Sequence, residues 1–241
     1  MKFSIIIPTL NEEKLLPGLL SQLCDEKLKK KYDYEIIISD GGSSDDTVNI
    51  ADCADKIIVH KAERRQSISE GRNKGAEAAE GNVLIFLNGD VRISDIEKFF
   101  DLIENDFVNS GYAAMTFAVT IFPAERKFID TAFMNFYNNY FYLLNLIGLG
   151  MGRGECQVIR RSIFKRFGGY DEKLFAGEDF DLFKRIRREK DILFERKLKI
   201  YESPRRYRKY GHWKIFFTWL SNSLAVMFLK KSFSKEWEEV R

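Results

Sequence analysis

The first part of the chain alternates short apolar segments with longer amphipathic ones, and this alternation narrows the folds that it can adopt. The apolar segments are rich in Ile, Val and Phe and have the length of buried strands. They span residues 3–7, 34–39, 56–60 and 83–87. The segments between them have the length of helices and span residues 14–24, 46–54 and 67–80. The pattern predicts an α/β fold with a mostly parallel central sheet flanked by helices.

Beyond residue 90 the alternation is less regular, but it still predicts strands and helices. The predicted elements are strands at 112–122 and 156–159 and helices at 96–107, at 178–190 and from Ser162 onward. Residues 126–150 are rich in Phe and Tyr, and residues 213–229 are mostly apolar. We therefore expect one domain over residues 1–210 and a helical C-terminal extension over residues 211–241.

Polar loops follow three of the apolar segments, at residues 8–12, 40–45 and 88–90. The carboxyl ends of parallel strands meet at one edge of a sheet, and ligands of such folds bind there. The first loop, Pro-Thr-Leu-Asn-Glu, contains no glycine. Its composition argues against the G-x-G-x-x-G loop of a nicotinamide-binding fold and against the glycine-rich basic loop of a nucleotidyltransferase. The three loops together predict a different kind of ligand site.

The second loop has the composition of a nucleotide-binding turn. Asp40 stands at the end of a strand, where its carboxylate can accept a hydrogen bond from the imide N–H of uracil or from the matching edge of guanine. Gly41 and the glycine after it allow the backbone to approach a ligand closely. An ordinary turn into a helix capped by Asp45 or Asp46 explains the same residues, and the loop alone does not separate the two interpretations.

Two further residues indicate phosphate and metal chemistry. Arg72 lies in the predicted helix 67–80, where it can steady the nucleotide loop or a phosphate, although an ordinary surface arginine fits the same pattern. Asp90 ends the third loop. A carboxylate that faces a diphosphate is a natural ligand of Mg²⁺ or Mn²⁺, because hard cations take oxygen ligands and bridge phosphate oxygens.

The loops and two later segments, in this order and at this spacing, resemble the motifs of family 2 glycosyltransferases. The matching segments are residues 4–12, 40–47, 72–75, 88–90, 168–172 and 178–182. The resemblance covers about residues 3–190 and implies a GT-A fold. It also implies transfer of a sugar, with inversion, from a nucleotide-sugar donor. UDP-sugar is our first expectation for the donor and GDP-sugar the second, and the acceptor is a glycan, a lipid-linked glycan or a polyprenyl phosphate.

The resemblance also assigns roles to residues. The nucleotide-sugar site is expected to contain Pro8, Thr9, Glu12, Asp40, Gly41, Ser43, Arg72, Asn88 and Gly89. The metal ligand is Asp90, the catalytic base is Asp179, and the acceptor-binding residues are Glu178, Arg205 and Arg206. Asn88 departs from the family, which has an aspartate at the first position of its D-x-D motif. An amide is a neutral and weaker metal ligand, so we expect Asp90 to be the only carboxylate on the cation; the alternative is transfer without a metal.

The assignment of Asp179 also has a physical basis. Inverting transfer needs an ionised carboxylate to accept the proton of the acceptor hydroxyl. The segment Gly-Glu-Asp at 177–179 begins a predicted helix, whose dipole favours a charged carboxylate. The alternative is that Glu178 and Asp179 merely cap the helix. The substitution at Asn88 leaves room for a second function, a sugar-nucleotide-binding subunit with weak catalysis.

Charge and cysteine content bear on partners and location. The net charge is +3, so no overall attraction to nucleic acid is expected. The three cysteines, Cys24, Cys53 and Cys156, are widely spaced and form no C-x-x-C pair, so we expect neither a disulfide nor a zinc site. These features favour a cytoplasmic location.

The C-terminal extension combines apolar and basic residues. Trp213, Trp219 and Trp237 lie in or near it, together with Arg205, Arg206, Arg208, Lys209, Lys230 and Lys231. Its apolar stretch, residues 215–229, is too short to span a bilayer easily. The combination predicts peripheral contact with the inner face of a membrane, and a membrane-associated scaffold is a further alternative function. Packing in the core or against a second subunit of a homodimer explains the apolar residues equally well.

Overall fold

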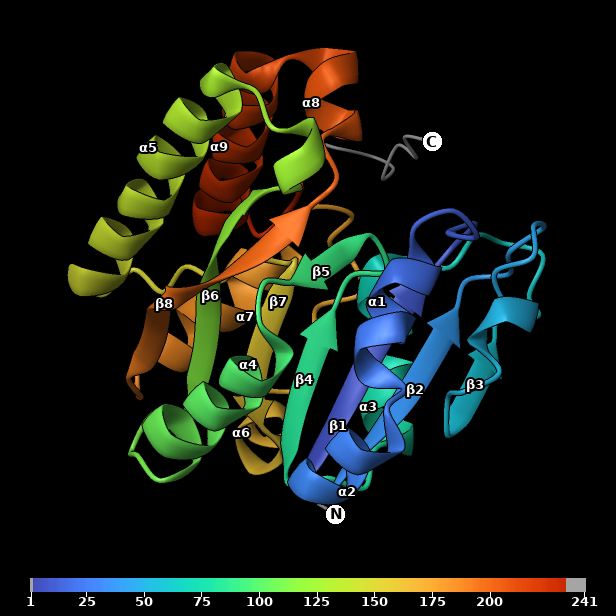
Figure 1. Cartoon of the computed structure of the whole chain (residues 1–241). Helices are drawn as coiled ribbons and strands as arrows, with labels where there is room; N and C mark the ends of the chain where they lie inside the picture. Colours follow the sequence, from blue (N-terminus) through green and yellow to red (C-terminus); the bar gives the residue numbers. More distant parts are fainter. Residues whose placement is uncertain (1, 233–241) are drawn as a thin grey trace.

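The computed structural model describes residues 2–232, which form one mixed α/β domain around an eight-stranded sheet (Figure 1). The sheet order is β3-β2-β1-β4-β7-β6-β8-β5. The strands are β1 (Phe3–Thr9), β2 (Tyr34–Asp40), β3 (Lys56–Val59), β4 (Val83–Leu87), β5 (Val91–Ile93), β6 (Ala114–Ile121), β7 (Cys156–Arg160) and β8 (Ile192–Glu202). Parallel pairing joins β1 to β2, β1 to β4, β2 to β3 and β6 to β8, whereas β7 and β5 run antiparallel to their neighbours. The predicted mostly parallel sheet is confirmed.

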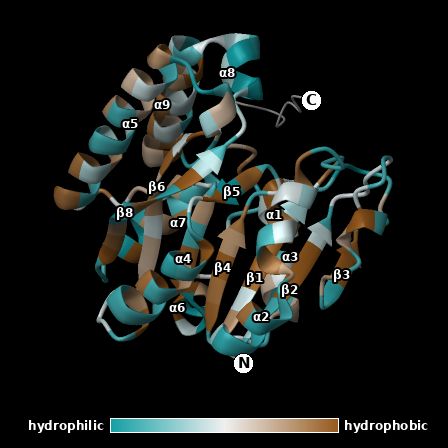
Figure 2. Ribbon diagram, in the orientation of Figure 1, coloured by the Kyte–Doolittle hydropathy of each residue, from teal (hydrophilic) through white to brown (hydrophobic). Residues whose placement is uncertain are grey.

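Helices cover both faces of the sheet because the strands are apolar on both sides. One face carries α1 (Leu16–Leu23), α2 (Glu26–Tyr32) and α4 (Ile96–Leu102), and the other carries α3 (Ile68–Ala78), α6 (Arg161–Arg166) and α7 (Glu178–Arg187). Along β1, Ile5 and Ile7 belong to the first core and Ile6 to the second, as the two-residue period of a strand requires. In Figure 2 the apolar colour concentrates in these central strands.

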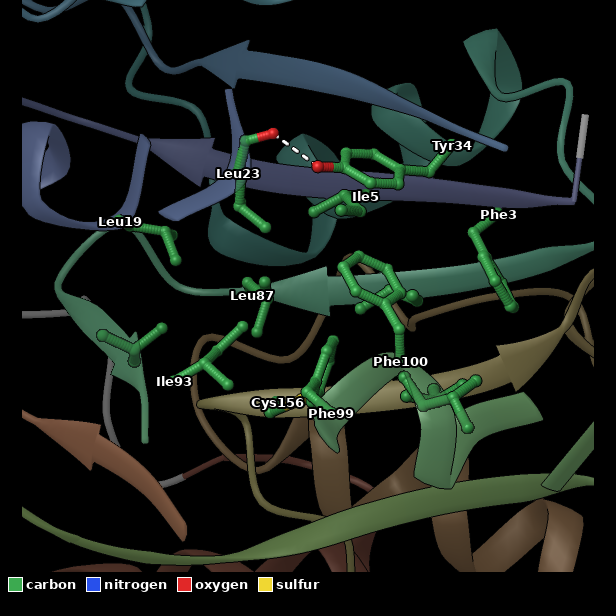
Figure 3. Packing of buried hydrophobic residues seen from close by; sticks show 14 of the residues in the cluster. Phe3, Ile5, Leu19, Leu23, Tyr34, Leu87, Ile93, Phe99, Phe100 and Cys156 are labelled. Atoms are coloured by element: carbon green, nitrogen blue, oxygen red, sulfur yellow. Dashed lines mark hydrogen bonds between the residues drawn. The ribbon is translucent and has the colours of Figure 1, made fainter. Parts of the chain in front are cut away.

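The first core shows how the helices are held on the sheet (Figure 3). The ring of Phe100 stacks between those of Tyr32 and Tyr34, at centroid distances of 4.6 and 4.9 Å. The Tyr34 hydroxyl donates to the Leu23 carbonyl oxygen, 2.5 Å away, at the end of α1. A buried phenol therefore keeps its polar tip satisfied while its ring packs among apolar neighbours.

A third layer stands beyond the carboxyl ends of β6 and β8. It contains α5 (Phe128–Leu146), α8 (Arg205–Tyr210) and α9 (His212–Leu229), which lie together at one end of the molecule (Figure 1). Aromatic rings join α5 to α9, for example Tyr137 and Trp219 with centroids 5.4 Å apart. No helix within residues 2–232 combines the length and the apolar character that a membrane span requires.

Several predicted elements need correction. Residues 46–54 were expected to be a helix, but only a single 3-10 turn, η1 (Asn49–Ala51), forms there. The helix predicted at 96–107 is α4 followed by a π-helical turn at Ile103–Val108. The sequence patterns also did not predict α2, β5 and β8. Strand β8 has charged residues inside it and pairs with β6 through a register shift, so its apolar alternation is broken.

The expectation of no disulfide was wrong. Cys24 and Cys53 are joined, with Cα atoms 6.0 Å apart, and Cys156 is free and buried. The bond links the end of α1 to the turn after η1, which are 29 residues apart in sequence. Spacing along the chain could not reveal this pair, because the two segments meet only once α1 and η1 pack on the same face of the sheet.

The close approach of residue 81 to β1 generates a stability prediction. A Cβ atom on Gly81 would lie 2.6 Å from the Phe3 carbonyl carbon and 2.7 Å from the Ser4 nitrogen, which are backbone atoms inside the sheet. Gly81→Ala should therefore lower the free energy of unfolding by about 1–3 kcal/mol through overpacking. Urea denaturation measures the loss. Gly111→Ala is the matched control, since a Cβ there meets nothing within 4 Å; equal stabilities of the two variants would contradict the prediction.

Candidate functional site

One cleft gathers the loops that follow the parallel strands. It lies at the carboxyl ends of β1 and β4, and its other walls come from the start of α3, the loop before β7, the N-terminus of α7, α8 and parts of α5 and α9. The predicted site residues that line it are Pro8, Thr9, Glu12, Arg72, Asn88, Gly89, Asp90, Glu178, Asp179, Arg205 and Arg206. Three other predicted residues, Asp40, Gly41 and Ser43, are not on its wall. The structure thus brings most of the candidates together, including pairs that are far apart in sequence.

Asp40 lies behind the wall of the cleft and is fully buried. Its Oδ1 accepts hydrogen bonds from the backbone N–H groups of Gly42 and Ser43, at 2.9 and 2.7 Å. Its Oδ2 accepts from the hydroxyls of Thr9 and Ser43, at 2.9 and 2.5 Å. The carboxylate therefore holds the ends of β1 and β2 together and shapes the turn that follows β2. A direct contact with a nucleobase stays a prediction.

The loop after β1 is fixed by the loop after β2. The backbone N–H of Asn11 donates to the Ser43 hydroxyl at 2.8 Å, and that of Glu12 donates to the Thr47 hydroxyl at 2.7 Å. Asn11 adopts a left-handed backbone conformation, with φ of 51°, which asparagine tolerates better than most residues. These bonds direct the Glu12 side chain to the cleft.

Arg72 is a buried junction, with only 1% of its surface exposed. From α3 it reaches three other segments. One Nη1–H donates to Glu178 Oε1 at 2.7 Å, and Nη2 donates to Asn88 Oδ1 at 3.0 Å and to the Gly154 carbonyl oxygen at 2.9 Å. Its guanidinium also lies 5.2 Å from the centre of the Tyr170 ring. Most of its hydrogen-bonding capacity is therefore used inside the protein, which favours the loop-steadying interpretation over direct phosphate binding.

The acids that begin α7 have different surroundings. Gly177, with φ of 81°, precedes the helix, and the Glu178 carboxylate is buried against Arg72. Asp179 lines the cleft, and its Oδ1 accepts the backbone N–H of Phe180 at 2.7 Å. Burial, reinforced by the negative charge of Glu178, raises the pKa of Asp179 to about 7. A carboxyl group that titrates near neutral pH inside a cleft has the properties of a general base.

The third loop supplies one carboxylate to the cleft. Asp90 is half-buried, and its oxygens are donors of the kind that Mg²⁺ and Mn²⁺ prefer. Its Oδ2 accepts from Arg205 Nη2 at 3.0 Å, while the Asn88 oxygen is bonded to Arg72. Residues 2–232 contain no group of three or more His, Cys, Asp or Glu side chains placed to hold a metal ion. The arrangement fits a cation that Asp90 shares with the phosphates of a substrate, but not one held by protein groups alone.

Arg205 and Arg206 begin α8 and both line the cleft. Arg205 donates to Glu12 Oε1 at 2.5 Å as well as to Asp90. It was expected among the acceptor-binding residues, but it lies beside the residues predicted for the donor and the metal. The sequence patterns could not predict that Arg205 contacts Glu12 and Asp90, because these partners are 193 and 115 residues away in the chain.

A buried charge network was missed by sequence reasoning. Arg153, in the loop before β7, is bonded to Glu155 at 3.0 Å and to Glu202, at the end of β8, at 3.2 Å. The Tyr207 hydroxyl donates to Glu202 at 2.8 Å. Burial, together with the nearby Glu155, raises the pKa of Glu202 well above its usual range. The sequence signal for this network was the pair of opposite charges, Arg153 and Glu155, inside the glycine-rich run 148–155. Glu202 could not be found because strand β8, which carries it, was not predicted.

Comparison with known proteins identifies relatives of this chain. The sequence model of the family described as Glycosyl transferase family 2 matches residues 4–168. An uncharacterized glycosyltransferase of Haemophilus influenzae is 27% identical over 201 residues, covering 77% of this chain and 62% of that protein. A PGL/p-HBAD biosynthesis glycosyltransferase of Mycobacterium tuberculosis is 36% identical over 93 residues, covering 36% of this chain and 35% of that protein. Each match thus covers less than two thirds of the relative.

Solved structures show the same fold at low sequence identity. The mannosyltransferase PcManGT from Pyrobaculum calidifontis, in complex with GDP-Man and Mn²⁺, has a TM-score of 0.71 at 15% identity, covering 95% of this chain and 63% of that one. TarS of Staphylococcus aureus, in complex with UDP-GlcNAc, has a TM-score of 0.57 at 18% identity, covering 81% of this chain and 58% of that one. The expected GT-A-like fold is confirmed.

The Arg72 junction generates a stability prediction. Arg72→Met should lower the free energy of unfolding by about 3–5 kcal/mol, because it leaves the buried Glu178 carboxylate without its counter-charge. The double variant Arg72→Met, Glu178→Leu should recover part of that loss. Chemical denaturation measures both. Arg166→Met, which removes an exposed pair with Glu189, should change stability by about 1 kcal/mol or less. A similarly small change for Arg72→Met would show that the junction is dispensable.

Proposed function

The chain belongs to glycosyl transferase family 2, and from this premise we propose that it transfers a sugar from a nucleotide-sugar donor with inversion at the anomeric carbon. One observation carries the proposal: Asp179, with its pKa near 7, lies in the same cleft as the loops that follow β1 and β4. We propose that these loops, backed by Asp40, hold the nucleotide, and that the sugar reaches toward Asp179.

The identity of the donor is part of the proposal. PcManGT was solved with GDP-Man and TarS with UDP-GlcNAc, so structures of this fold accept either nucleotide. We keep UDP-sugar as the first candidate and GDP-sugar as the second. The backbone positions that we assign to the nucleotide are Pro8 and Thr9 at the end of β1 and Gly89 after β4, all of which line the cleft.

The proposed reaction is a direct displacement. The acceptor hydroxyl attacks C1 of the sugar, its proton passes to the carboxylate of Asp179, and the bond from C1 to the diphosphate oxygen breaks with its electron pair on that oxygen. Glu178, paired with Arg72, keeps the start of α7 in place. A divalent cation bound through Asp90 and the diphosphate would stabilise the charge of the leaving group. Structures of this fold have been solved with Mn²⁺ or Mg²⁺ bound.

The third layer supports contact with a membrane surface. Large apolar side chains of α5 and α9, and of Ile147 directly after α5, are exposed; they are Phe128, Ile129, Phe136, Leu143, Leu146, Ile147, Trp213, Phe217, Leu224, Phe228 and Leu229. Such a patch is unusual on the surface of a monomer. Exposed lysines, Lys214, Lys230 and Lys231, lie on or beside α9. We propose that this face rests on an anionic bilayer and that the acceptor is lipid-linked. Trp237, also expected in this contact, lies outside the described residues.

The proposed base generates a kinetic prediction. Asp179→Asn should lower the rate of transfer by about 10²–10⁴-fold while the affinity for the donor stays near that of the wild type. A base must be ionised to act, and its pKa is raised, so the wild-type rate should rise with pH through about 7 and level off above it.

Release of nucleoside diphosphate from UDP- and GDP-sugars, followed from about pH 5.5 to 9, measures both effects. Asp181→Asn is the matched control, because Asp181 is on the same helix but pairs with Arg185 away from the cleft. Near-normal transfer by Asp179→Asn would remove it from the mechanism. A wild-type protein that binds the donor and releases nothing would favour the sugar-nucleotide-binding subunit.

The exposed apolar face generates a binding prediction. The double variant Phe217→Ser, Phe228→Ser should lose at least tenfold in affinity for vesicles that contain anionic lipid, since each buried Phe contributes roughly 1.5–3 kcal/mol. Binding of the wild type should weaken as salt rises. Co-sedimentation with vesicles measures both. Ile57→Thr, at an exposed position on β3, should bind like the wild type. A wild-type protein that stays in the supernatant would favour a dimer face, which sedimentation velocity detects.

A further inference from the structure

Arg205 occupies the place in the cleft where positive charge is needed. Its Nη2 lies 2.5 Å from Glu12 Oε1 and 3.0 Å from Asp90 Oδ2, so one guanidinium bridges the carboxylates that follow β1 and β4. All three side chains are partly exposed, at 22% for Arg205, 13% for Glu12 and 24% for Asp90. They are therefore reached from the cleft and are not enclosed in the core.

The bridge and a divalent cation compete for the same carboxylate oxygen. A metal ion on Asp90 Oδ2 would stand beside a guanidinium 3.0 Å from that oxygen, and the two positive charges would repel each other. The neighbouring Asn88 cannot help to hold the metal while its oxygen accepts from Arg72. The third loop therefore provides few free oxygen ligands for a cation. The positive charge that a cation would bring is already present on Arg205.

Two buried arginines of the cleft, Arg72 and Arg153, are committed to the protein. Arg72 is 1% exposed and bonded to Glu178, Asn88 and Gly154. Arg153 is 2% exposed and bonded to two glutamates. Arg205 differs, because 22% of its side chain is exposed and its partners Glu12 and Asp90 are also partly exposed, so a bound diphosphate can approach all three.

We propose that Arg205 binds the diphosphate of the donor and serves as the counter-ion of the leaving group. The inference rests on the proposed function and adds to it a donor-side role for Arg205. When the donor enters, the guanidinium turns from the carboxylates of Glu12 and Asp90 to the phosphate oxygens, for which its forked N–H groups are well matched. When the bond from C1 to the diphosphate oxygen breaks, the negative charge that develops there faces Arg205. A divalent cation then strengthens binding of the donor but is not required for it.

The test is the affinity for UDP and GDP, measured by calorimetry in EDTA and in Mn²⁺. The wild type should bind one of them in EDTA. Arg205→Gln should lose about 10- to 100-fold in EDTA, as expected for a lost hydrogen bond to a charged group, and less in Mn²⁺. The affinity of Arg205→Lys in EDTA should lie between those of the wild type and Arg205→Gln. Uridine and guanosine, which carry no phosphate, should bind the wild type and Arg205→Gln equally.

Two further variants make the test specific. Arg166→Gln removes an exposed arginine of α6 that pairs with Glu189, and its affinity should equal that of the wild type. Asp90→Asn weakens the bridge, so in EDTA it should bind the diphosphate at least as tightly as the wild type. Circular dichroism and the thermal midpoint check that each variant is folded.

Two results would overturn the inference alone: binding that requires Mn²⁺ in the wild type, or folded Arg205→Gln and Arg205→Lys that bind the diphosphate in EDTA as tightly as the wild type. Loss of binding by Asp90→Asn in EDTA would also contradict it, because the carboxylate would then be needed where we expect it to compete. If neither UDP nor GDP binds the wild type with or without Mn²⁺, the proposed function itself fails.

Discussion

The guanidinium of Arg72 connects parts of the cleft that come from four separate places in the chain. It extends from α3 to the loop after β4, the loop before β7 and the start of α7, through bonds of 2.7–3.0 Å. Burying such a charge is costly unless it is paired and hydrogen-bonded, and Glu178 together with two neutral oxygens meets that condition. The position of Asp179, the residue after Glu178, therefore depends on the buried charge of Arg72.

Two arginines balance the charges of the cleft. Arg72 compensates Glu178, while burial keeps Asp179 a weak acid with its pKa near 7. Arg205 compensates Glu12 and Asp90. Arg72 is buried and holds the loops in place, whereas Arg205 is partly exposed. An arginine side chain therefore serves two purposes in this cleft, and its exposure to solvent determines which one.

Much of the fold and part of the cleft could be predicted from local patterns. The four strands of the parallel half were found because each is a short apolar run, and the helix expected over 67–80 is α3. Strand β8 was missed, because its charged residues and its register shift hide the two-residue period. Because β8 was not predicted, Glu202 and its pairing with Arg153 could not be predicted either.

The sequence by itself determined that polar loops follow β1, β2 and β4, because the period of a strand and the position of a turn are local properties. It therefore placed Glu12, Asn88 and Asp90 at one edge of a sheet. Only the tertiary structure decided what these groups touch. The bond from Arg72 to Glu178 spans 106 residues, that from Arg205 to Glu12 spans 193, and the disulfide from Cys24 to Cys53 spans 29. Such partners are chosen by the packing of distant elements, and no local period in the chain records that choice.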